Sequence, residues 1–179
     1  MQNGALHKDV IFAVIDSGQG LGNGLCVPAG PLRAPFKDQA RVVDYCISIG
    51  GEAPEKVRSY FKDRLLRATL VPDETQAQAL RGQKVFAFCG IGHPAKFEQS
   101  LRACGVTLAG QRAFPDHHLF SRVEIEQLLA EARRRHALPI TTTKDFVRVA
   151  AVAPDLADNV AVLPVRLVFD DEARVKAIL

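Results

Sequence analysis

Three short segments of this 179-residue sequence gather side chains that exchange protons or bind anions. They are residues 90–93 (GIGH), 116–118 (DHH) and 141–145 (TTTKD), which together hold imidazoles, carboxylates, an ammonium group and exposed backbone amides. An aspartate directly before a histidine can orient the imidazole, and an imidazole exchanges protons near physiological pH. The segments therefore predict acid–base and anion-binding chemistry, with Asp116 and His117 as the candidate pair.

Two other interpretations stay open on spacing alone. Asp116 can simply turn the loop and leave both histidines at the surface, because adjacent residues in a loop need not face each other. His117 and His118 are also of a type that binds zinc, but no third ligand follows at a motif spacing, so no metal site is predicted. The four cysteines show no C-x-x-C pair and predict neither a zinc site nor a disulfide framework.

The elements around these segments alternate between strand and helix. Short apolar runs predict strands at 84–89, 106–114 and 138–142, and a final strand at 159–169. Pro94 and Gly105 bound a predicted helix, the capping box at Ser121 and Glu124 opens a second, and a third covers 146–152. This alternation favours an α/β fold, a mostly parallel three-layer sheet of βα units, whose loops meet at one edge.

The first part of the chain has a different pattern. Residues 10–15 form an apolar run typical of a strand buried on both faces. Residues 17–36 hold five glycines and three prolines, which predict a structured loop. Its glycines fit neither G-x-G-x-x-G nor G-x-x-x-x-G-K-[ST], so a substrate loop or a turn is preferred to a nucleotide cradle. Residues 42–49 predict a strand, and 57–71 fit either a helix or a hairpin.

Composition excludes several classes of protein. The net charge is only +3, and the single dense basic run, 133–136, is explained by cations at a helix C-terminus, so no nucleic-acid partner is predicted. The longest strongly apolar run, 10–15, is far shorter than the ~20 residues of a membrane-spanning helix. No secretory signal is legible, so the expected location is cytoplasmic.

Several motifs in series resemble one family. Residues 22–24 (GNG), 28–35 (PAGPLRAP), 88–92 (FCGIG), 114–118 (FPDHH) and 141–145 (TTTKD) are similar in order and spacing to motifs of the tetraacyldisaccharide 4'-kinases of lipid A biosynthesis in Gram-negative bacteria. The resemblance implies the C-terminal domain of a P-loop-type kinase. Such an enzyme transfers the γ-phosphate of ATP, with Mg²⁺, to the 4'-hydroxyl of tetraacyldisaccharide 1-phosphate, a lipid disaccharide, with peripheral contact to the inner membrane.

The resemblance also implies roles for individual residues. His117 would assist at the sugar hydroxyl, Asp116 would position it, and Arg33 would lie near the phosphates, where a guanidinium fork matches their oxygens. The remaining residues expected to bind substrate or phosphate are Asn23, His118, Lys144 and Asp145. Ala34 and Thr143 depart from the family pattern, which has glutamate at both positions.

The family's N-terminal half, with its Walker A loop and acidic pair, has no counterpart here. Residues 1–3 (MQN) look like the tail of the family's D-D-G-F-Q-N segment. The resulting expectation is a remnant strand and Gly/Pro-rich loop of the nucleotide-domain side at 1–50, a linker at 51–83 and an α/β C-terminal domain at 84–179. The chain alone is expected to be inactive and to bind neither ATP nor Mg²⁺ tightly, with a separate or missing N-terminal half as partner.

Two alternatives to this kinase function remain open on the sequence. The first is a non-catalytic module that keeps an anionic-glycolipid surface but has lost phosphoryl transfer, since neither metal nor phosphate donors are visible. The second, more distant alternative is a metal-dependent hydrolase built on His117 and His118.

Overall fold

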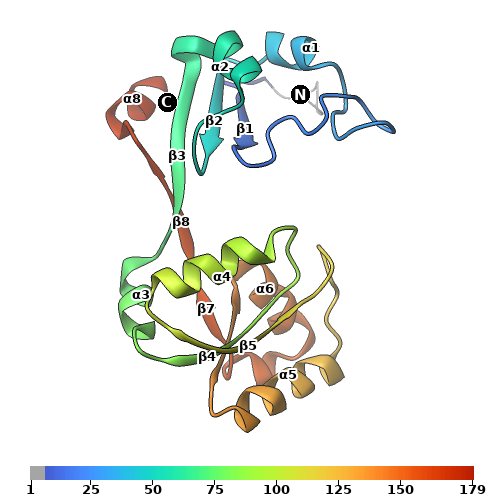
Figure 1. Ribbon diagram of the computed structural model, residues 1–179, viewed down its shortest axis with the longest axis vertical. Coiled ribbons are helices and arrows are strands. Elements are labelled where there is room, and N and C mark those ends of the chain that lie inside the picture. The colour runs from blue at the N-terminus through green and yellow to red at the C-terminus, as the bar shows by residue number, and fades with distance from the viewer. Residues whose placement is uncertain (1–6) are drawn as a thin grey trace. The chain divides into compact units, whose positions relative to one another are not determined.

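The computed structural model describes residues 7–179, so the resemblance at residues 1–3 lies outside the described part. The chain divides into two compact units (Figure 1). Unit 1 contains the residues up to Leu70 together with Leu167–Leu179, and unit 2 contains Val71–Arg166. Among residues 7–179, no helix has both the length and the apolar composition needed to cross a bilayer.

Unit 2 is a three-layer α/β fold. Its four strands are parallel and lie in the order β5-β4-β6-β7, with bounds β4 (Lys84–Cys89), β5 (Thr107–Ala113), β6 (Leu138–Thr142) and β7 (Ala161–Leu163). Helices α3 (Glu74–Leu80) and α4 (Pro94–Ala103) cover one face of the sheet. Helices α5 (Arg122–Arg134), α6 (Thr143–Val152) and α7 (Pro154–Ala157) cover the other. The predicted α/β fold of parallel βα units is confirmed.

The central strand β4 shows why both faces are covered. Its side chains alternate, so that Phe86 and Phe88 pack in one core with Ile125 of α5, whereas Val85 packs in a second core with Leu101 of α4. All five of these side chains are nearly inaccessible to solvent. A strand that is apolar on both sides can be stable only between two layers of helices.

The predicted boundaries of α4 and the predicted start of α5 are confirmed by their capping contacts, whereas α6 begins at Thr143, three residues before the predicted start at residue 146. Pro94 occupies the first turn of α4, and Gly105, with φ +75°, follows its end. At the start of α5, the Ser121 hydroxyl accepts the Glu124 N–H and the Glu124 carboxylate accepts the Ser121 N–H, which forms the complete capping box.

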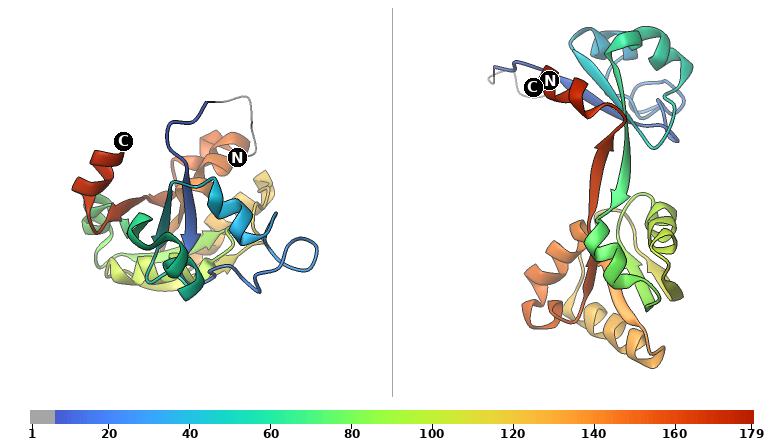
Figure 2. Two further views of the ribbon diagram at one scale, coloured as in Figure 1. Left: turned by 90° about the horizontal axis from the view of Figure 1, so that it is seen from above. Right: turned by 90° about the vertical axis from the view of Figure 1, so that its left-hand side faces the viewer.

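Unit 1 is a smaller α/β sheet in the order β1-β2-β3-β8. The bounds are β1 (Phe12–Asp16), β2 (Tyr45–Ile49), β3 (Leu65–Pro72) and β8 (Val165–Phe169). Strands β1, β2 and β3 are parallel, and β8 runs in the opposite direction beside β3 (Figure 2). Helices α1 (Phe36–Arg41) and α2 (Glu55–Phe61) cover one face, and α8 (Glu172–Ile178) covers the other.

Several expectations differ from the structure. Residues 10–15 do not form a strand buried on both faces, because β1 lies at the edge of its sheet and Val14 is 61% exposed. Residues 159–169 are not one strand, because Pro164 has no N–H for a ladder; β7 ends before it, and β8 joins the other sheet. Residues 57–71 contain the end of α2, a 3₁₀ turn (Lys62–Arg64) and most of β3. The expected linker 51–83 instead contributes Val57, Leu66 and Leu80 to hydrophobic cores, so the units divide at 70/71 and 166/167.

Candidate functional site

The loops that follow β4, β5 and β6 lie at one edge of the unit 2 sheet. The parallel pairing of β4 with both neighbours places the carboxyl ends of the three strands together, as predicted. The loops also contact each other directly, because the Gly90 N–H donates to Asp145 (2.9 Å) and its carbonyl accepts the N–H of His117 (3.2 Å). The three chemistry-bearing segments therefore form a single polar network.

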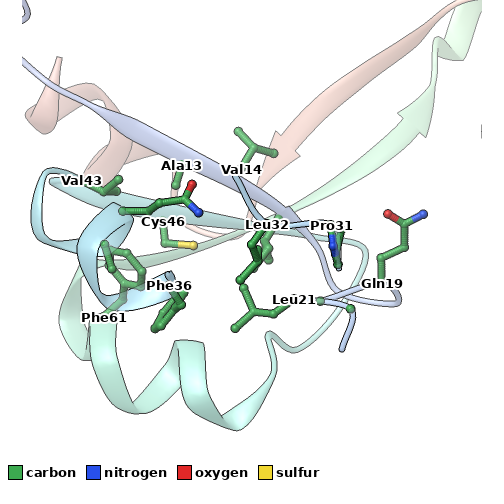
Figure 3. A pocket seen from close by; sticks show the side chains of 15 residues that line it. Ala13, Val14, Gln19, Leu21, Pro31, Leu32, Phe36, Val43, Cys46 and Phe61 are labelled. Atoms are coloured by element: carbon green, nitrogen blue, oxygen red, sulfur yellow. The ribbon is translucent and has the colours of Figure 1, made fainter. Parts of the chain in front are cut away.

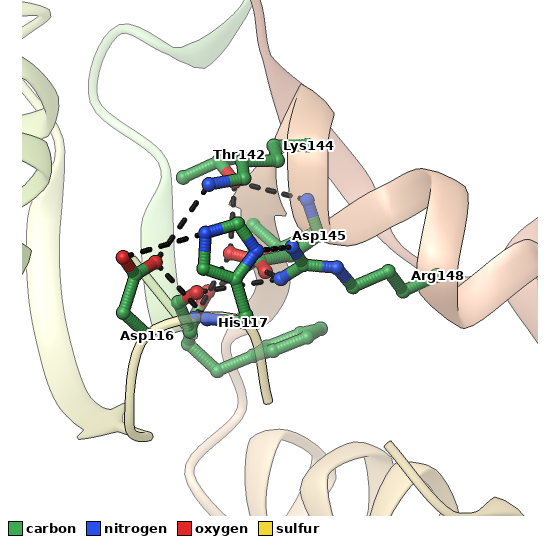
Figure 4. A network of polar contacts seen from close by, with 9 residues as sticks. Asp116, His117, Thr142, Lys144, Asp145 and Arg148 are labelled. Carbon is green, nitrogen blue, oxygen red and sulfur yellow. Dashed lines mark hydrogen bonds and ion pairs between the residues drawn. The ribbon is translucent and has the colours of Figure 1, made fainter. Parts of the chain in front are cut away.

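Asp145 is the buried centre of this network (Figure 4). Its Oδ2 accepts hydrogen bonds from the Gly90 N–H and the Thr142 hydroxyl, both at 2.9 Å, and its Oδ1 accepts Nη1 of Arg148 at 2.9 Å. The carboxylate has no exposed surface. The expected contact of Asp145 with substrate stays a prediction that this buried position does not support.

Arg148 connects this buried carboxylate to the histidine. Its Nη2 lies 3.1 Å from Nδ1 of His117, while its Nη1 contacts Asp145 and the Gly90 carbonyl. The Arg148 side chain is 19% exposed, whereas that of His117 is 70% exposed. The network thus runs from the protein interior to an imidazole that faces solvent.

Asp116 and His117 face each other, as the candidate pair requires. Oδ2 of Asp116 lies 3.6 Å from Nε2 of His117, and Oδ1 accepts the backbone N–H of His117 at 3.0 Å. His117 has a left-handed backbone, with φ +62°, which few residue types other than Gly, Asn, Asp and His adopt. The ammonium of Lys144 lies 3.7 Å from Oδ1 of Asp116 and is half exposed. One cationic side chain, that of Lys144, and the solvent-facing imidazole of His117 therefore lie beside the Asp116 carboxylate.

His118 points away from this pair and packs into the core of the loop. Its ring stacks on Phe114, with 4.5 Å between centroids, and meets Phe120 edge-on at 5.0 Å. Its Nε2 lies 3.2 Å from Oε1 of Glu124. The Ser121 N–H and hydroxyl, and then the nearby His118, lower the pKa of Glu124. The predicted substrate contact of His118 is not tested by this arrangement, in which its ring anchors the loop.

The other two predicted residues, Asn23 and Arg33, belong to unit 1. The Asn23 amide donates to the Ala29 carbonyl (2.7 Å) and accepts the Leu25 N–H (3.1 Å), so it closes the Gly/Pro-rich loop. Arg33 is exposed and has no hydrogen bond or ion pair with any of residues 7–179. The expected contact of Arg33 with phosphate stays a prediction.

The Gly-rich loop of unit 1 does not fit a nucleotide cradle. Its amides are used inside the protein: the Gly18 and Gln19 N–H groups donate to the Asp16 carboxylate, and the Gly20 N–H donates to the Asp16 carbonyl. The N–H groups of Ser17, Gly22 and Gly24 also donate to backbone carbonyls. A phosphate loop instead leaves such amides free for the phosphate oxygens. The loop is a shaped turn.

A hollow of about 580 Å³ lies beside this loop in unit 1 (Figure 3). Leu21, Leu32, Phe36, Phe61 and Val14 are among the side chains that line it. The described lining includes no acidic, basic or imidazole side chain, and its one titratable group is the buried thiol of Cys46. Among residues 7–179, no three His, Cys, Asp or Glu side chains form a group that could hold a metal ion.

Comparison with known proteins adds a family to this geometry. The sequence model of the tetraacyldisaccharide-1-P 4'-kinase family matches residues 1–179. The chain belongs to this family. Among the curated relatives, the tetraacyldisaccharide 4'-kinase of Rhodopseudomonas palustris (strain BisB5) is 46% identical, and that of Methylobacterium sp. (strain 4-46) is 48% identical; each match covers 99% of this chain. The chain spans only 54% of the length of either relative.

A solved structure of a 4'-kinase shares the fold. The structure, described as the "apo" form of LpxK from Aquifex aeolicus in complex with ATP, superposes with a TM-score of 0.54. The match covers 96% of this chain and 52% of that chain at 18% identity, which supports the fold alone. The 4'-kinase family and the parallel α/β fold that the motifs suggested are both confirmed.

Sequence reasoning missed one residue of the network, Arg148. Its signal was present: Asp145 and Arg148 are three positions apart, a spacing that brings opposite charges together on a helix. Thr142 and Asp145 also form the [ST]-x-x-[DE] pattern of a helix start, and the Asp145 N–H does donate to the Thr142 hydroxyl (3.1 Å). The helix was predicted to begin at residue 146, after Asp145. The two residues were therefore not expected on one helix, and Arg148 was not placed beside the loops.

Proposed function

We propose that this chain is the acceptor-side half of a lipid A 4'-kinase. In the complete enzyme, the γ-phosphate of ATP would pass to the 4'-hydroxyl of tetraacyldisaccharide 1-phosphate. Family membership supports this reaction, and the Asp116–His117 pair carries the proposal, because it is an exposed acid–base pair at the carboxyl edge of a parallel sheet. Such a pair is suited to orient a hydroxyl and to manage its proton.

Each residue of the pair has a role that follows from its contacts. The Nε2 edge of the His117 ring faces solvent and the Asp116 carboxylate, so it would meet the sugar hydroxyl or its base. Asp116 would hold His117 through the backbone N–H and the facing ring nitrogen. Lys144 would bring positive charge to the same place, and Arg33 of unit 1 would supply a guanidinium for phosphate oxygens.

ATP and Mg²⁺ are proposed to bind to a part of the enzyme that this chain does not span. The amides of the Gly-rich loop are already hydrogen-bonded, and the relatives are about twice as long as the matched region. The chain alone should therefore neither bind ATP tightly nor hydrolyse it. Calorimetric titration of ATP and Mg²⁺ into the pure chain tests this, and a saturable micromolar site would overturn it.

The catalytic role is tested by restoring the missing part. The chain is joined to the segment of the R. palustris relative that it does not cover, and transfer of phosphate from ATP to a tetraacyldisaccharide 1-phosphate is measured. His117→Asn is compared with His136→Asn, because both histidines are exposed and have positive φ, 62° and 50°, which asparagine tolerates. We expect at least a ~100-fold loss of kcat for His117→Asn and almost none for His136→Asn.

Equal rates for the two variants would refute the role of His117.

The substrate is a lipid, so we also propose cytoplasmic placement with peripheral contact to the inner membrane. Co-flotation of the joined protein with anionic vesicles checks the membrane contact, and its complete absence at low salt would contradict it.

A further inference from the structure

The contact between Arg148 and His117 has a chemical consequence for the imidazole. A guanidinium has five N–H donors and no acceptor, and it stays protonated in proteins. Nη2 of Arg148 is 3.1 Å from Nδ1 of His117. Nδ1 must therefore be the nitrogen that carries the lone pair, and in the neutral ring the proton must be on Nε2.

The guanidinium is held in place independently of the histidine. Its Nη1 donates to Oδ1 of the fully buried Asp145 at 2.9 Å, and Asp145 is itself fixed by the Gly90 N–H and the Thr142 hydroxyl. A buried carboxylate with an arginine partner is strongly held, because separating the two leaves an uncompensated charge. The Nη2 atom is thus presented at a fixed place at the edge of the sheet.

The histidine is held from its other side as well. The backbone N–H of His117 donates to Oδ1 of Asp116 (3.0 Å) and to the Gly90 carbonyl (3.2 Å), and these two hydrogen bonds fix the position of its Cα. Its Nε2 faces Oδ2 of Asp116 at 3.6 Å, where a proton on Nε2 meets an acceptor. The contacts on the two ring nitrogens therefore favour the same tautomer.

We propose that Arg148 is a positioning residue that fixes the ring of His117 as the Nε2–H tautomer, through its buried partner Asp145. His117 then enters the reaction as a hydrogen-bond donor at Nε2, directed at a carboxylate or an oxygen, and Nδ1 is not available for proton exchange. The placement of His117 in the kinase reaction rests on the proposed function, whereas the tautomer does not.

Nitrogen NMR of the imidazole ring tests the proposal on the 179-residue chain itself. Long-range ¹H–¹⁵N spectra at a pH where the ring is neutral distinguish a protonated from an unprotonated ring nitrogen, and His117→Asn assigns the signals. We expect Nε2–H in the unmutated chain. One hydrogen bond to a charged group biases the tautomer ratio by about tenfold or more, and this bias should be lost in Arg148→Ala.

Two further variants separate the tautomer effect from general damage. Arg122→Ala is the matched control, because Arg122 also pairs with a carboxylate in unit 2, that of Asp155, but does not touch His117. If Arg148→Ala fails to fold, Asp145→Asn combined with Arg148→Met removes both partners and leaves no unpaired buried charge. The Nε2–H excess should be unchanged in Arg122→Ala and about tenfold smaller in the double variant, in which only the Asp116 contact remains on the ring.

The outcomes distinguish this proposal from the proposed function. An Nδ1–H ring in the unmutated chain, or a tautomer ratio unchanged by loss of Arg148, overturns the role of Arg148 whatever the activity. A shifted ratio in Arg148→Ala supports it. If that shift occurs but His117→Asn keeps full activity in the joined protein, the positioning role stands and the catalytic role of His117 fails.

Discussion

Replacing Asp145 by alanine removes the carboxylate to which Gly90, Thr142 and Arg148 are hydrogen-bonded. Removing one partner of a buried ion pair costs roughly 3–5 kcal/mol of unfolding free energy. The Arg148 side chain keeps 19% of its surface exposed, so water can partly hydrate the abandoned guanidinium. We therefore expect the lower end of the range, about 3 kcal/mol, for Asp145→Ala. Asp145→Asn keeps an acceptor for the Gly90 N–H and should cost about 1–2 kcal/mol.

Hydrogen exchange measures this loss where it occurs. Because the chain has two units, one melting curve does not isolate unit 2, whereas exchange at the amides of β4 and β6 does. Asp155→Ala is the control, since Asp155 also pairs with an arginine but is exposed, and an exposed pair contributes little. The double variant with Arg148→Met should lose less than the sum of the single losses, by about 1–3 kcal/mol.

Two results would refute this reasoning. The first is a loss below about 1 kcal/mol for Asp145→Ala, which is the size expected of an ordinary surface contact. The second is strict additivity with Arg148→Met, because independent residues do not share a buried pair.

Three further predictions concern the same structure. Gly90→Ala should reduce the hydrogen-exchange protection of β4 more than Gly92→Ala. A Cβ on Gly90 would lie 3.1 Å from Cβ of His118 and 3.3 Å from the Pro115 carbonyl oxygen, whereas one on Gly92 meets only ordinary contacts; equal protection in the two variants would contradict the crowding. The lowered pKa of Glu124 means that its charge stabilises the fold at neutral pH, and this stabilisation is lost as the pH falls through the folded-state pKa. The difference in unfolding free energy between the unmutated chain and Glu124→Gln should therefore shrink below about pH 4, and a difference that stays constant with pH would exclude the effect. Burial raises the pKa of Cys46 and of Cys89 to about 11, so little of either thiol is in the reactive thiolate form at pH 8. Mass spectrometry after alkylation at pH 8 should therefore find the half-buried Cys26 modified first, and rapid labelling of Cys89 in the folded chain would contradict its burial.

The regular part of the fold could be predicted because its signals are local. Pro94, Gly105 and the Ser121–Glu124 capping box each determine a boundary within a few residues of themselves, and the structure has all three. The parallel edge followed from the alternation of strands and helices. The same local reasoning failed at Pro164, because the strand pattern of 159–169 continues through a residue that has no N–H to donate to a sheet. The strands on either side of Pro164, β7 and β8, belong to different sheets.

The network at the site could be predicted only in part. The sequence places Asp116 and His117 next to each other, but whether they face each other depends on the left-handed backbone of His117, which has no neighbouring glycine to indicate it. The roles of Asp145 and His118 depend on burial, which spacing does not reveal. The contact between Arg148 and His117 spans 31 positions and exists only once β5 and β6 lie on either side of β4.

Unit 1 is built from two separate segments of the chain, and this has a consequence for how the chain folds during synthesis. Ile47, Leu66 and Ala68 are buried against Leu167, Phe169, Val175 and Ile178 at the far end of the sequence. The chain leaves the ribosome in the order from N- to C-terminus. Unit 2 is continuous in sequence, so it can complete its core while unit 1 still lacks β8 and α8. Until then, one face of the nascent β2–β3 sheet is apolar and uncovered, which makes it a candidate surface for chaperone binding. Deleting only the last 13 residues, 167–179, should therefore expose unit 1 to proteases and leave unit 2 protected.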